Sequence, residues 1–464
     1  MTIEELCRFW RGKGHQLYLV GGCVRDRLLG KPTSDYDLAT DTLPEKTLSL
    51  LEEAGCRAYP LGMEFGTVAT TMDTPGGPVE VQITTFRCGE SYDKGSRHPR
   101  VVFGGSLEED LVRRDFTINS MAMDCGGELI DPLGGREDLE NGLLRTPLDP
   151  AETFTEDPLR MLRAFRFACA LDLEIEAATF DAIGERKSLI TEISRERWKM
   201  EMDRLLTVPE AENVADTLRL MRRSGLLAEM IPEFLGVFEQ DGLSQGSAHD
   251  GDIWTHTLEA VSKAVSDSPC VRWALLLHDI GKPRCRSVGD DGRVHFYGHG
   301  KRGGEMAGKI AERFRFSRKE RKCLTFLVEN HMRPVLYTED WSGRAIRKLA
   351  GDAGDHLEEL LEVAESDIAA HTGPFASEGR SRLEELRKRL AGLSEAVHRR
   401  VLPRELGTIL MSRVGSDLAR APQVGVILAN LEELVHQGIL PELAPPELYL
   451  EYMEEHPEVT GRSC

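Results

Sequence analysis

The hydrophobic periodicity of this 464-residue chain changes near residue 150, and the change restricts the folds that the chain can adopt. Residues 15–145 alternate short apolar runs of strand type with helical segments, which is typical of a mixed α/β domain. Beyond that point the apolar residues recur mainly at helical spacing. The sequence therefore predicts an α+β protein, in which a head with a mixed β-sheet and helices is followed by all-helical domains.

The length of the chain is sufficient for two to four domains with sizeable cores. A stretch rich in Gly, Ser and Asp, EQDGLSQGSAHDGD at 239–252, indicates one boundary. A histidine-rich helical region follows it, and the remainder is helical and becomes acidic at its end. We expect four parts, with boundaries at 1–145, 146–245, 246–375 and 376–464.

Composition narrows the classes of protein. No apolar run reaches the length of a membrane span, and MTIEELCRFWRGKG at the start is acidic before it is apolar, unlike a signal peptide. The ten cysteines are scattered without a CxxC pair, which predicts reduced thiols in a cytoplasmic protein. The net charge of -20 argues against wholesale nucleic-acid binding but is compatible with a local basic path.

Two glycines lie between a predicted strand and a predicted helix in LYLVGGCVRDRLLG, residues 17–30. Gly21 and Gly22 would let the backbone approach a phosphate group, which the N–H groups of the helix N-terminus would bind. Arg25, in the first turn, could add a charged fork. Taken alone, the pair is more often a simple glycine turn.

Two carboxylates follow in SDYDLAT. Asp35 and Asp37 are two residues apart on a predicted strand, so their side chains point to the same face. Like charges this close repel each other, which suggests that a hard cation lies between them. Mg²⁺ ions held there against a triphosphate would activate an attacking hydroxyl and neutralise the leaving pyrophosphate. The alternative is a pair of solvated aspartates on an edge strand.

Three segments in this order, GGCVRDRLLG…SDYDLAT, DLVRRDFTINSMA and TEDPLRMLRAFRFA, resemble the class II tRNA nucleotidyltransferases. That family includes the CCA-adding enzymes and bacterial poly(A) polymerases, and the resemblance covers roughly residues 15–240. It implies a head that adds CCA to tRNA 3′ ends from CTP and ATP, without a nucleic-acid template and with release of pyrophosphate. An enzyme that adds only CC or only A, or a poly(A) polymerase, would show the same motifs.

The resemblance also implies roles for individual residues. Asp35 and Asp37 match the catalytic carboxylates that bind Mg²⁺, and Asp157 and Arg160 match the pair that reads the incoming base. The other matched positions would contact the nucleotide: the triphosphate at Gly21, Gly22 and Arg25, the region near the sugar at Asp115 and Asn119, and further groups at Arg114, Arg163 and Arg166.

The segment EDPLRMLRAFRF can also be interpreted without the resemblance. Asp157 followed by Pro158 predicts an N-cap and a first helical position. Arginines every third residue then form a cationic stripe, which by itself is more often a solvated helix face. As a template, a carboxylate would accept from an exocyclic amino group while a guanidinium donates to a ring acceptor. Cytosine and adenine present that edge, whereas uracil and guanine do not.

The polar, Gly-rich segment at 84–105 is similar to the mobile loop of that family, which helps to switch from C to A addition. An ordinary long hairpin would have the same composition. Another segment, RFRFSRKERK at 313–322, has six basic residues and one acidic residue interleaved with phenylalanines. It predicts either an RNA-backbone contact or a charged helix face over a small apolar seam.

In the histidine-rich region the order H…HD…H…H…D resembles the HD superfamily of metal-dependent phosphohydrolases. The resemblance implies one metal site at His256, His278, Asp279 and Asp367, and a second metal or a phosphate at His299 and His331. Imidazole and carboxylate ligands suit Mn, Ni, Fe, Co or Zn.

Phosphate ends or 2′,3′-cyclic phosphates on RNA would be plausible substrates of the HD site, although an HD fold can also persist as a scaffold. If hydrolysis were instead the main activity, the head would be an RNA-binding module. The remaining histidines, His371 among them, are interpreted as ordinary surface or core residues.

Overall fold

The computed structural model describes residues 1–464 except 34, 75–76, 92–99, 241–251, 291–292, 399–401, 415–420, 437–438 and 461–464. The chain divides into two compact units. The first comprises Met1–Leu336 and Asp355–Arg380, and the second comprises Tyr337–Gly354 and Ser381–Cys464. The connector predicted at 239–252 lies almost wholly outside the described residues, and the four domain boundaries stay predictions.

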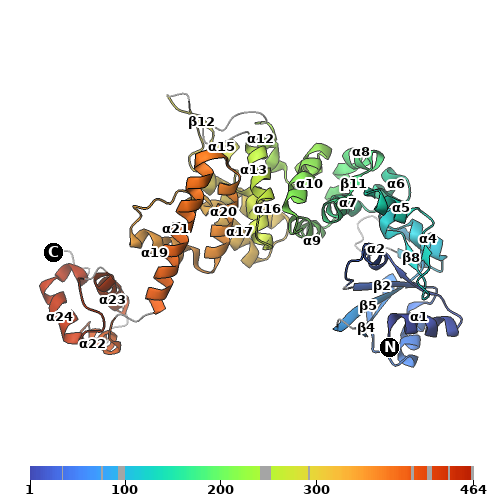
Figure 1. Ribbon diagram of the computed structural model, residues 1–464, viewed down its shortest axis with the longest axis horizontal. Helices are drawn as coiled ribbons and strands as arrows, with labels where there is room; N and C mark the ends of the chain where they lie inside the picture. The colour runs from blue at the N-terminus through green and yellow to red at the C-terminus, as the bar shows by residue number, and fades with distance from the viewer. Residues whose placement is uncertain are drawn as a thin grey trace. The chain divides into compact units, whose positions relative to one another are not determined.

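The head contains a seven-stranded sheet with strand order β3-β4-β5-β2-β1-β8-β9 (Figure 1, blue to cyan). Strand β2 is parallel to β5, and the other neighbours are antiparallel, which confirms the predicted mixed sheet. The strands are β1 (Leu17–Val20), β2 (Asp35–Thr40), β3 (Ala58–Gly62), β4 (Thr67–Thr74), β5 (Gly77–Thr85), β8 (Ala122–Met123) and β9 (Leu129–Ile130).

Both faces of the sheet are packed. Helices α1 (Ile3–Gly12) and α3 (Pro44–Glu53) contribute Trp10 and Leu50 to a buried cluster that includes Leu38 of β2. On the opposite face, α4 (Leu107–Val112) packs its leucines against the next residue of β2, Ala39. Because successive residues of a strand point to opposite faces, β2 contributes to both clusters from adjacent positions.

Helices follow the head as predicted, with two small exceptions. Residues 143–144 and 174–175 pair as the parallel strands β10 and β11, and residues 287–288 and 294–295 pair as the antiparallel strands β12 and β13. The helices after the sheet are α5 (Gly135–Glu140), α6 (Pro150–Glu156), α7 (Leu159–Leu171), α8 (Ala177–Arg186), α9 (Arg195–Leu206), α10 (Ala211–Ser224), α11 (Leu226–Met230) and α12 (Leu235–Phe238).

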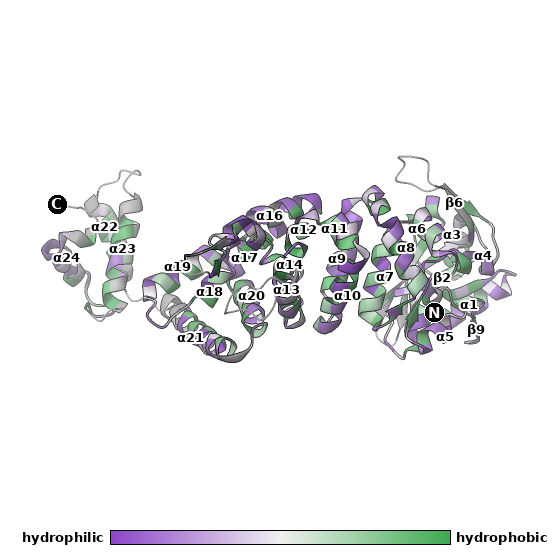
Figure 2. Ribbon diagram, turned by 90° about the horizontal axis from the view of Figure 1, so that it is seen from above, coloured by the Kyte–Doolittle hydropathy of each residue, from purple (hydrophilic) through white to green (hydrophobic). Residues whose placement is uncertain are grey.

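The histidine-rich region is a helical bundle whose helices carry hydrophobic and hydrophilic residues on different sides (Figure 2). Within α14, every residue from Val271 to Leu277 is buried, so this helix is the centre of the bundle. The helices are α13 (Ile253–Ser262), α14 (Pro269–Leu277), α15 (Lys282–Cys285), α16 (His299–Arg313), α17 (Arg318–Asn330), α18 (Met332–Val335) and α20 (Leu357–Ala369).

A disulfide joins Cys270 of α14 to Cys323 of α17. The prediction that the cysteines are reduced thiols is therefore wrong for this pair. Sequence spacing did not reveal it because 53 residues separate the two cysteines, which meet only when the two helices pack. The other seven cysteines of the described residues are free.

The second unit has its own apolar core. Leu406, Leu410, Leu431 and Tyr449 are buried there. Its helices are α19 (Gly343–Ala353), the later part of α21 (Gly373–His398), α22 (Arg404–Val414), α23 (Ala421–His436) and α24 (Pro446–Glu455). Across both units, none of the described helices is long and apolar enough to cross a membrane.

Candidate active sites

The two glycines connect β1 to helix α2 (Gly22–Leu28), as the sequence predicts. Gly21 has φ of +73°, and a Cβ atom there would lie 2.9 Å from Nη1 of Arg114. A side chain at this position would therefore strain the backbone and push the arginine away. Glycine allows Arg114 to lie directly against the turn.

The paired carboxylates lie on the central strand β2, between β5 and β1, so the alternative of an edge strand is wrong. Asp35 and Asp37 point to one face, and their partners on β5 are Glu80 and Gln82. Asp37 is accessible to solvent, but desolvation by the protein around it raises the pKa of its carboxyl group; Arg114 opposes this shift and Asp35 adds to it. A cation bound at the two carboxylates would relieve the repulsion between them.

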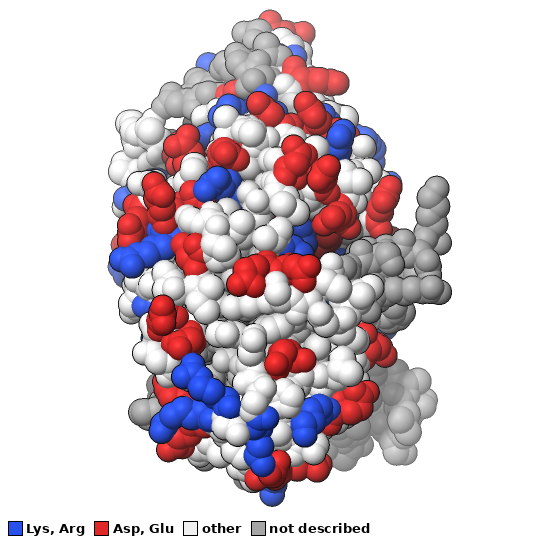
Figure 3. Space-filling model, turned by 90° about the vertical axis from the view of Figure 1, so that its right-hand side faces the viewer, with Lys and Arg blue, Asp and Glu red and all other residues white. Residues whose placement is uncertain are grey.

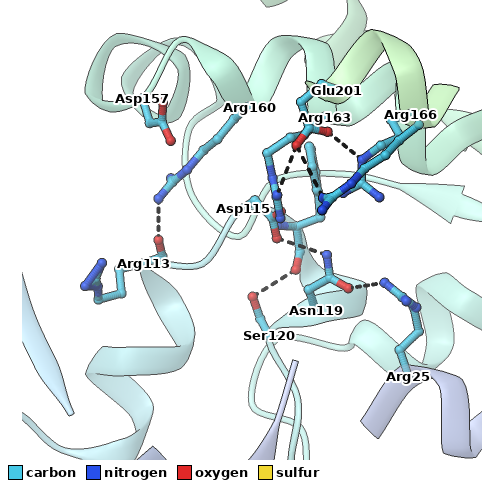
Figure 4. A network of polar contacts seen from close by, with 12 residues as sticks. Arg25, Arg113, Asp115, Asn119, Ser120, Asp157, Arg160, Arg163, Arg166 and Glu201 are labelled. Carbon is cyan, nitrogen blue, oxygen red and sulfur yellow. Dashed lines mark hydrogen bonds and ion pairs between the residues drawn. The ribbon is translucent and has the colours of Figure 1, made fainter. Parts of the chain in front are cut away.

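A chain of polar contacts links α2 to the loop that follows α4 (Figure 4). Arg25 donates from Nη1 to Oδ1 of Asn119 over 2.7 Å, and Asn119 donates to Oδ1 of Asp115 over 3.0 Å. Arg163 of α7 donates to the other oxygen of Asp115 from both Nε, at 2.9 Å, and Nη2. Segments that are far apart in sequence are thus held in one network.

Asp115 is the negative centre of this network. Burial alone would raise the pKa of its carboxyl group, but Arg163 and the hydrogen bond from Asn119 outweigh it and lower the pKa to about 2. The carboxylate is therefore ionised at neutral pH and holds Arg163 in place.

Asp157 and Arg160 lie side by side at the start of α7 (Figure 4). The Asp157 carboxylate accepts from the N–H of Leu159 over 3.1 Å, and Arg160 donates to the carbonyl of Arg113 over 2.6 Å. The helix begins at Leu159, one residue later than predicted, with Pro158 as its N-cap. The Asp157 side chain still accepts from an N–H group of the first turn, and this hydrogen bond uses one of its two carboxylate oxygens.

The sequence interpretation missed Glu201 of α9, which is completely buried. It accepts from Nε of Arg166 over 2.5 Å and lies 3.8 Å from Arg163. A signal was available, because Glu201 occurs at helical spacing among the buried residues Trp198, Met202 and Leu205. A carboxylate at a core position of a helix requires a charged partner.

The predicted residues of the head and of residues 157–166 surround one cavity of about 520 Å³, although Asp35, at the exposed end of β2, is not among the residues that line it. Phe167, which the sequence interpretation did not select, also lines the cavity, with the Arg166 guanidinium 4.0 Å from the centroid of its ring. The predicted residues in the walls are Gly21, Gly22, Arg25, Asp37, Arg114, Asp115, Asn119, Asp157, Arg160, Arg163 and Arg166.

The histidine-rich region forms a second site, which we name the HD cluster: His256, His278, Asp279, His299, His331 and Asp367. Its members form overlapping groups whose ligand atoms lie within 4.8 Å of one another. His256 Nε2 is 2.9 Å from Oδ1 of Asp367, and His278 Nε2 is 3.3 Å from Oδ2 of Asp279. His299 and His331 approach each other to 3.3 Å between their Nε2 atoms.

Three of these histidines are oriented in the same way. The Nδ1 atoms of His278, His299 and His331 lie 2.8–2.9 Å from the carbonyls of the residues three positions earlier. A carbonyl can only accept, so each Nδ1 donates and, in the neutral ring, each Nε2 keeps a lone pair for a metal. His278 Nε2 is buried beside Oδ2 of Asp279, so the two atoms lie close enough to bind one ion. A buried imidazole nitrogen next to a carboxylate oxygen fits a transition-metal site.

Glycines bring the helices of the HD cluster close together. A Cβ atom on Gly281 would lie 2.3 Å from the carbonyl oxygen of His299, and one on Gly304 would lie 2.9 Å from Cβ of Glu329. These approaches place the start of α16 against the turn after Asp279 and pack α16 on α17.

Two residues of this site were missed. His371 was interpreted as an ordinary histidine, but its Nε2 lies 3.9 Å from Oδ1 of Asp367 and its ring packs against His256. Its spacing of four residues after Asp367 was the available signal. Lys282 is buried, and its Nζ lies 2.6 Å from Oδ2 of Asp279.

The basic stretch at 313–322 supports the structural alternative. Phe314 is completely buried, Phe316 packs on Trp273, and Arg313 forms an ion pair with Glu233 over 2.6 Å. Elsewhere, Figure 3 shows several Lys and Arg side chains in the lower part of the face that it presents, with Asp and Glu among and above them. Basic side chains therefore group locally on an acidic protein.

Three family models match the chain in order. The poly A polymerase head domain matches residues 17–145, the probable RNA and SrmB-binding site of polymerase A matches 172–236, and the HD domain matches 251–388.

Among curated proteins, the CCA-adding enzyme of Bacillus pumilus is 46% identical over 193 residues, which are 42% of this chain and 46% of that protein. The CCA-adding enzyme of Streptococcus suis is 44% identical over 196 residues, 42% of this chain and 47% of that protein. The chain therefore spans about half the length of the curated relatives that it matches.

Solved structures match over a longer stretch. The Bacillus stearothermophilus CCA-adding enzyme in complex with CTP is 27% identical, with a TM-score of 0.68 and 99% of each chain covered. The Thermotoga maritima CCA-adding enzyme complexed with tRNA_CCA has a TM-score of 0.58 at 20% identity, covering 97% of this chain and 94% of that one, and it supports the fold.

Proposed function

We propose that the chain is a class II CCA-adding enzyme and that it adds CCA to tRNA 3′ ends from CTP and ATP, releasing pyrophosphate. The observation that carries the proposal is the meeting of three separate sequence motifs in the walls of one cavity. A cytoplasmic location, as the sequence predicts, would suit this reaction.

The triphosphate would bind at the turn between β1 and α2. Backbone N–H groups at Gly22 and the start of α2 would donate to phosphate oxygens, and Arg25 and Arg114 would add charge. Asp35 and Asp37 would hold Mg²⁺. When bound, Mg²⁺ would activate the attacking hydroxyl and neutralise the charge of the leaving pyrophosphate.

The base would be read at the other end of the cavity. Arg160 is held by the carbonyl of Arg113, and one oxygen of Asp157 is used by the Leu159 N–H. Nη2 of Arg197 lies 3.5 Å from the other oxygen and leaves it a second lone pair. The other carboxylate oxygen would accept from the amino group of cytosine or adenine, while Arg160 donates to the ring. Uracil and guanine would leave these groups unpaired, and an unpaired buried group is costly.

For the HD cluster we propose metal-dependent hydrolysis of phosphate ends or 2′,3′-cyclic phosphates on RNA. Its buried set of imidazole and carboxylate ligands favours Mn, Ni, Fe, Co or Zn over Mg²⁺. The metal would polarise the phosphate and lower the pKa of a bound water. The observation that supports this activity is the buried group of His256, His278 and Asp279, whose ligand atoms lie within 4.8 Å of one another.

The test of the head offers purified protein three tRNAs, ending before CCA, after C and after CC, with CTP and ATP supplied separately and together. Full CCA on all three would support the proposal. Extension of the last tRNA alone would mean an A-adding enzyme, and extension that stops after CC would mean a CC-adding one. Long A tails would indicate a poly(A) polymerase. No extension at all would favour a mainly hydrolytic protein, with the head as an RNA-binding module.

A further inference from the structure

A second cavity, of about 600 Å³, opens onto the HD cluster. Asp279, His299 and Asp367 contribute to its walls, and so do Phe296, Tyr297 and Phe375. A phosphate group would occupy only a small part of such a volume, because pockets of about 300–1,000 Å³ hold whole small molecules. The apolar part of this cavity therefore has room for something attached to the phosphate.

Tyr297 is the most exposed large hydrophobic side chain among the described residues, with 78% of its surface accessible. Its ring stacks on His295 with centroids 5.1 Å apart and planes inclined by only 13°. An aromatic ring that is solvent exposed contributes little to folding, because it buries little apolar area. The stacked pair instead presents a flat aromatic surface at a cavity wall.

The position of this surface is tied to the HD cluster. Tyr297 precedes the metal-ligand candidate His299 by two residues, across Gly298 with φ of +77°. His299 donates from Nδ1 to the carbonyl of Phe296 over 2.9 Å, which fixes the turn that carries Tyr297. The aromatic surface and the predicted metal ligand are therefore parts of one hydrogen-bonded turn.

Cationic side chains complete the cavity. Lys282 lies on Oδ2 of Asp279, and Lys301 and Arg293 contribute to the same walls. Positive charge beside a metal cluster suits a phosphate, and an exposed aromatic face suits a planar base, which every nucleotide carries.

We infer that Tyr297, backed by His295, binds the base of a nucleotide whose phosphate ester lies at the HD cluster. The site would then hydrolyse phosphate esters of nucleosides or RNA ends in preference to esters without a base. In the reaction, a water oxygen bonds to phosphorus, the phosphorus–oxygen bond to the ribose breaks, and the ribose oxygen takes a proton from that water. The inference rests on the hydrolytic activity proposed above.

The experiment uses the full chain with Mn²⁺, Ni²⁺, Co²⁺ or Zn²⁺ and two matched pairs of substrates. Adenosine 2′,3′-cyclic phosphate is compared with glycerol 1,2-cyclic phosphate, and adenosine 3′-phosphate with glycerol 2-phosphate. We expect the nucleotide of the hydrolysed pair to be preferred by about 10-fold or more in kcat/KM, mainly through KM. Tyr297→Ala should remove that preference and leave the glycerol ester unchanged.

Two further variants serve as controls. Tyr297→Phe keeps the ring and should retain the preference, whereas Tyr59→Ala removes another exposed tyrosine, in the head, and should change neither substrate. Equal kcat/KM values for the nucleotide in Tyr297→Ala and the wild type would overturn the inference. An equal loss of kcat/KM for the nucleotide and for its glycerol ester in Tyr297→Ala would also overturn the inference, because the substitution would then act on the metal cluster.

If the wild type hydrolyses no substrate with any of these metals, the proposed hydrolysis fails, and a binding measurement decides the inference. With the head saturated by CTP and Mg²⁺, adenosine 3′-phosphate is titrated calorimetrically into the protein loaded with Ni²⁺. Binding by the wild type that is lost in Tyr297→Ala would support a base site at Tyr297. No binding, or equal binding by both proteins, would overturn it.

Discussion

The head site and the HD cluster both contain aspartates, but they are assembled in opposite ways. Asp35 and Asp37 are two residues apart on one strand, whose periodicity alone places both on one face. The HD cluster is built from helix ends and from residues as much as 111 positions apart, such as His256 and Asp367. A strand can position a ligand pair by itself, whereas helix ends need tertiary packing to do so.

The difference extends to the chemistry. The head pair offers only oxygen atoms at the side of an open cavity, which suits Mg²⁺ that keeps part of its water shell. The HD cluster offers buried nitrogen and oxygen atoms, and its histidines are oriented by backbone carbonyls. Two sites on one chain should therefore differ in metal preference and respond independently to mutation.

Asp37→Ala should have the largest effect on nucleotide addition. Removing one of two adjacent carboxylates takes away charge stabilisation that the transition state requires, so we expect a loss on the order of 10³-fold or more. Incorporation of labelled ATP into tRNA ending in CC measures it. Glu64→Ala removes an exposed carboxylate elsewhere in the head and should be close to wild type. Wild-type rates in Asp37→Ala would refute the assignment.

Asp157→Ala should change base choice by a smaller factor. A lost charged hydrogen bond costs about 1.5–3 kcal/mol, so UTP or GTP should compete roughly 10-fold or more better against CTP and ATP. Because Asp157 also caps α7, Asp157→Asn is the matched control: it keeps an acceptor for Leu159 and loses the charge. Background misincorporation in the alanine variant, with normal CTP and ATP rates, would make Asp157 a helix cap only.

The pH dependence of stability should show the smallest effect. The pKa of Asp115 is lowered to about 2 from the usual 3.8, so its contribution to stability is present above pH 4 and is lost as pH falls towards 2. The difference in unfolding free energy between wild type and Asp115→Asn should shrink by about 1 kcal/mol from pH 5 to pH 3. Chemical denaturation measures it.

The control for this prediction is Asp216→Asn, which alters an aspartate that is exposed beside Arg219. It should show a much smaller change with pH, because solvent screens an exposed pair. A difference for Asp115→Asn that stays constant across this range would contradict the ion pair with Arg163 as the source of the shift.

Most of the head could be predicted because its signals are local. The strand, Gly21–Gly22 and helix order follow from a few adjacent residues, and the same-face aspartates follow from the strand period. Sequence could not reveal the partner of a buried charge. The sequence shows Glu201 as a carboxylate at a core position of its helix. Its contacts with Arg163 and Arg166, however, depend on how α9 packs on α7.

The HD cluster was predictable through the order of its histidines and aspartates. What the order could not show is which other residues the packing adds. His371 lies just after α20, and it joins the cluster because α20 packs against α13, which carries His256. The link between Cys270 and Cys323 depends on packing in the same way, since it requires α14 to meet α17.

The most direct test of two separate centres measures both reactions in Asp37→Ala and in the double variant His278→Ala, Asp279→Ala. Addition is assayed with Mg²⁺, and hydrolysis of a 2′,3′-cyclic phosphate is assayed with Mg²⁺, Mn²⁺ and Ni²⁺, with circular dichroism to check the fold. Our account predicts that Asp37→Ala loses addition and keeps hydrolysis, while the double variant loses hydrolysis and keeps addition. If the double variant folds but loses addition, the two centres are coupled and the account is wrong.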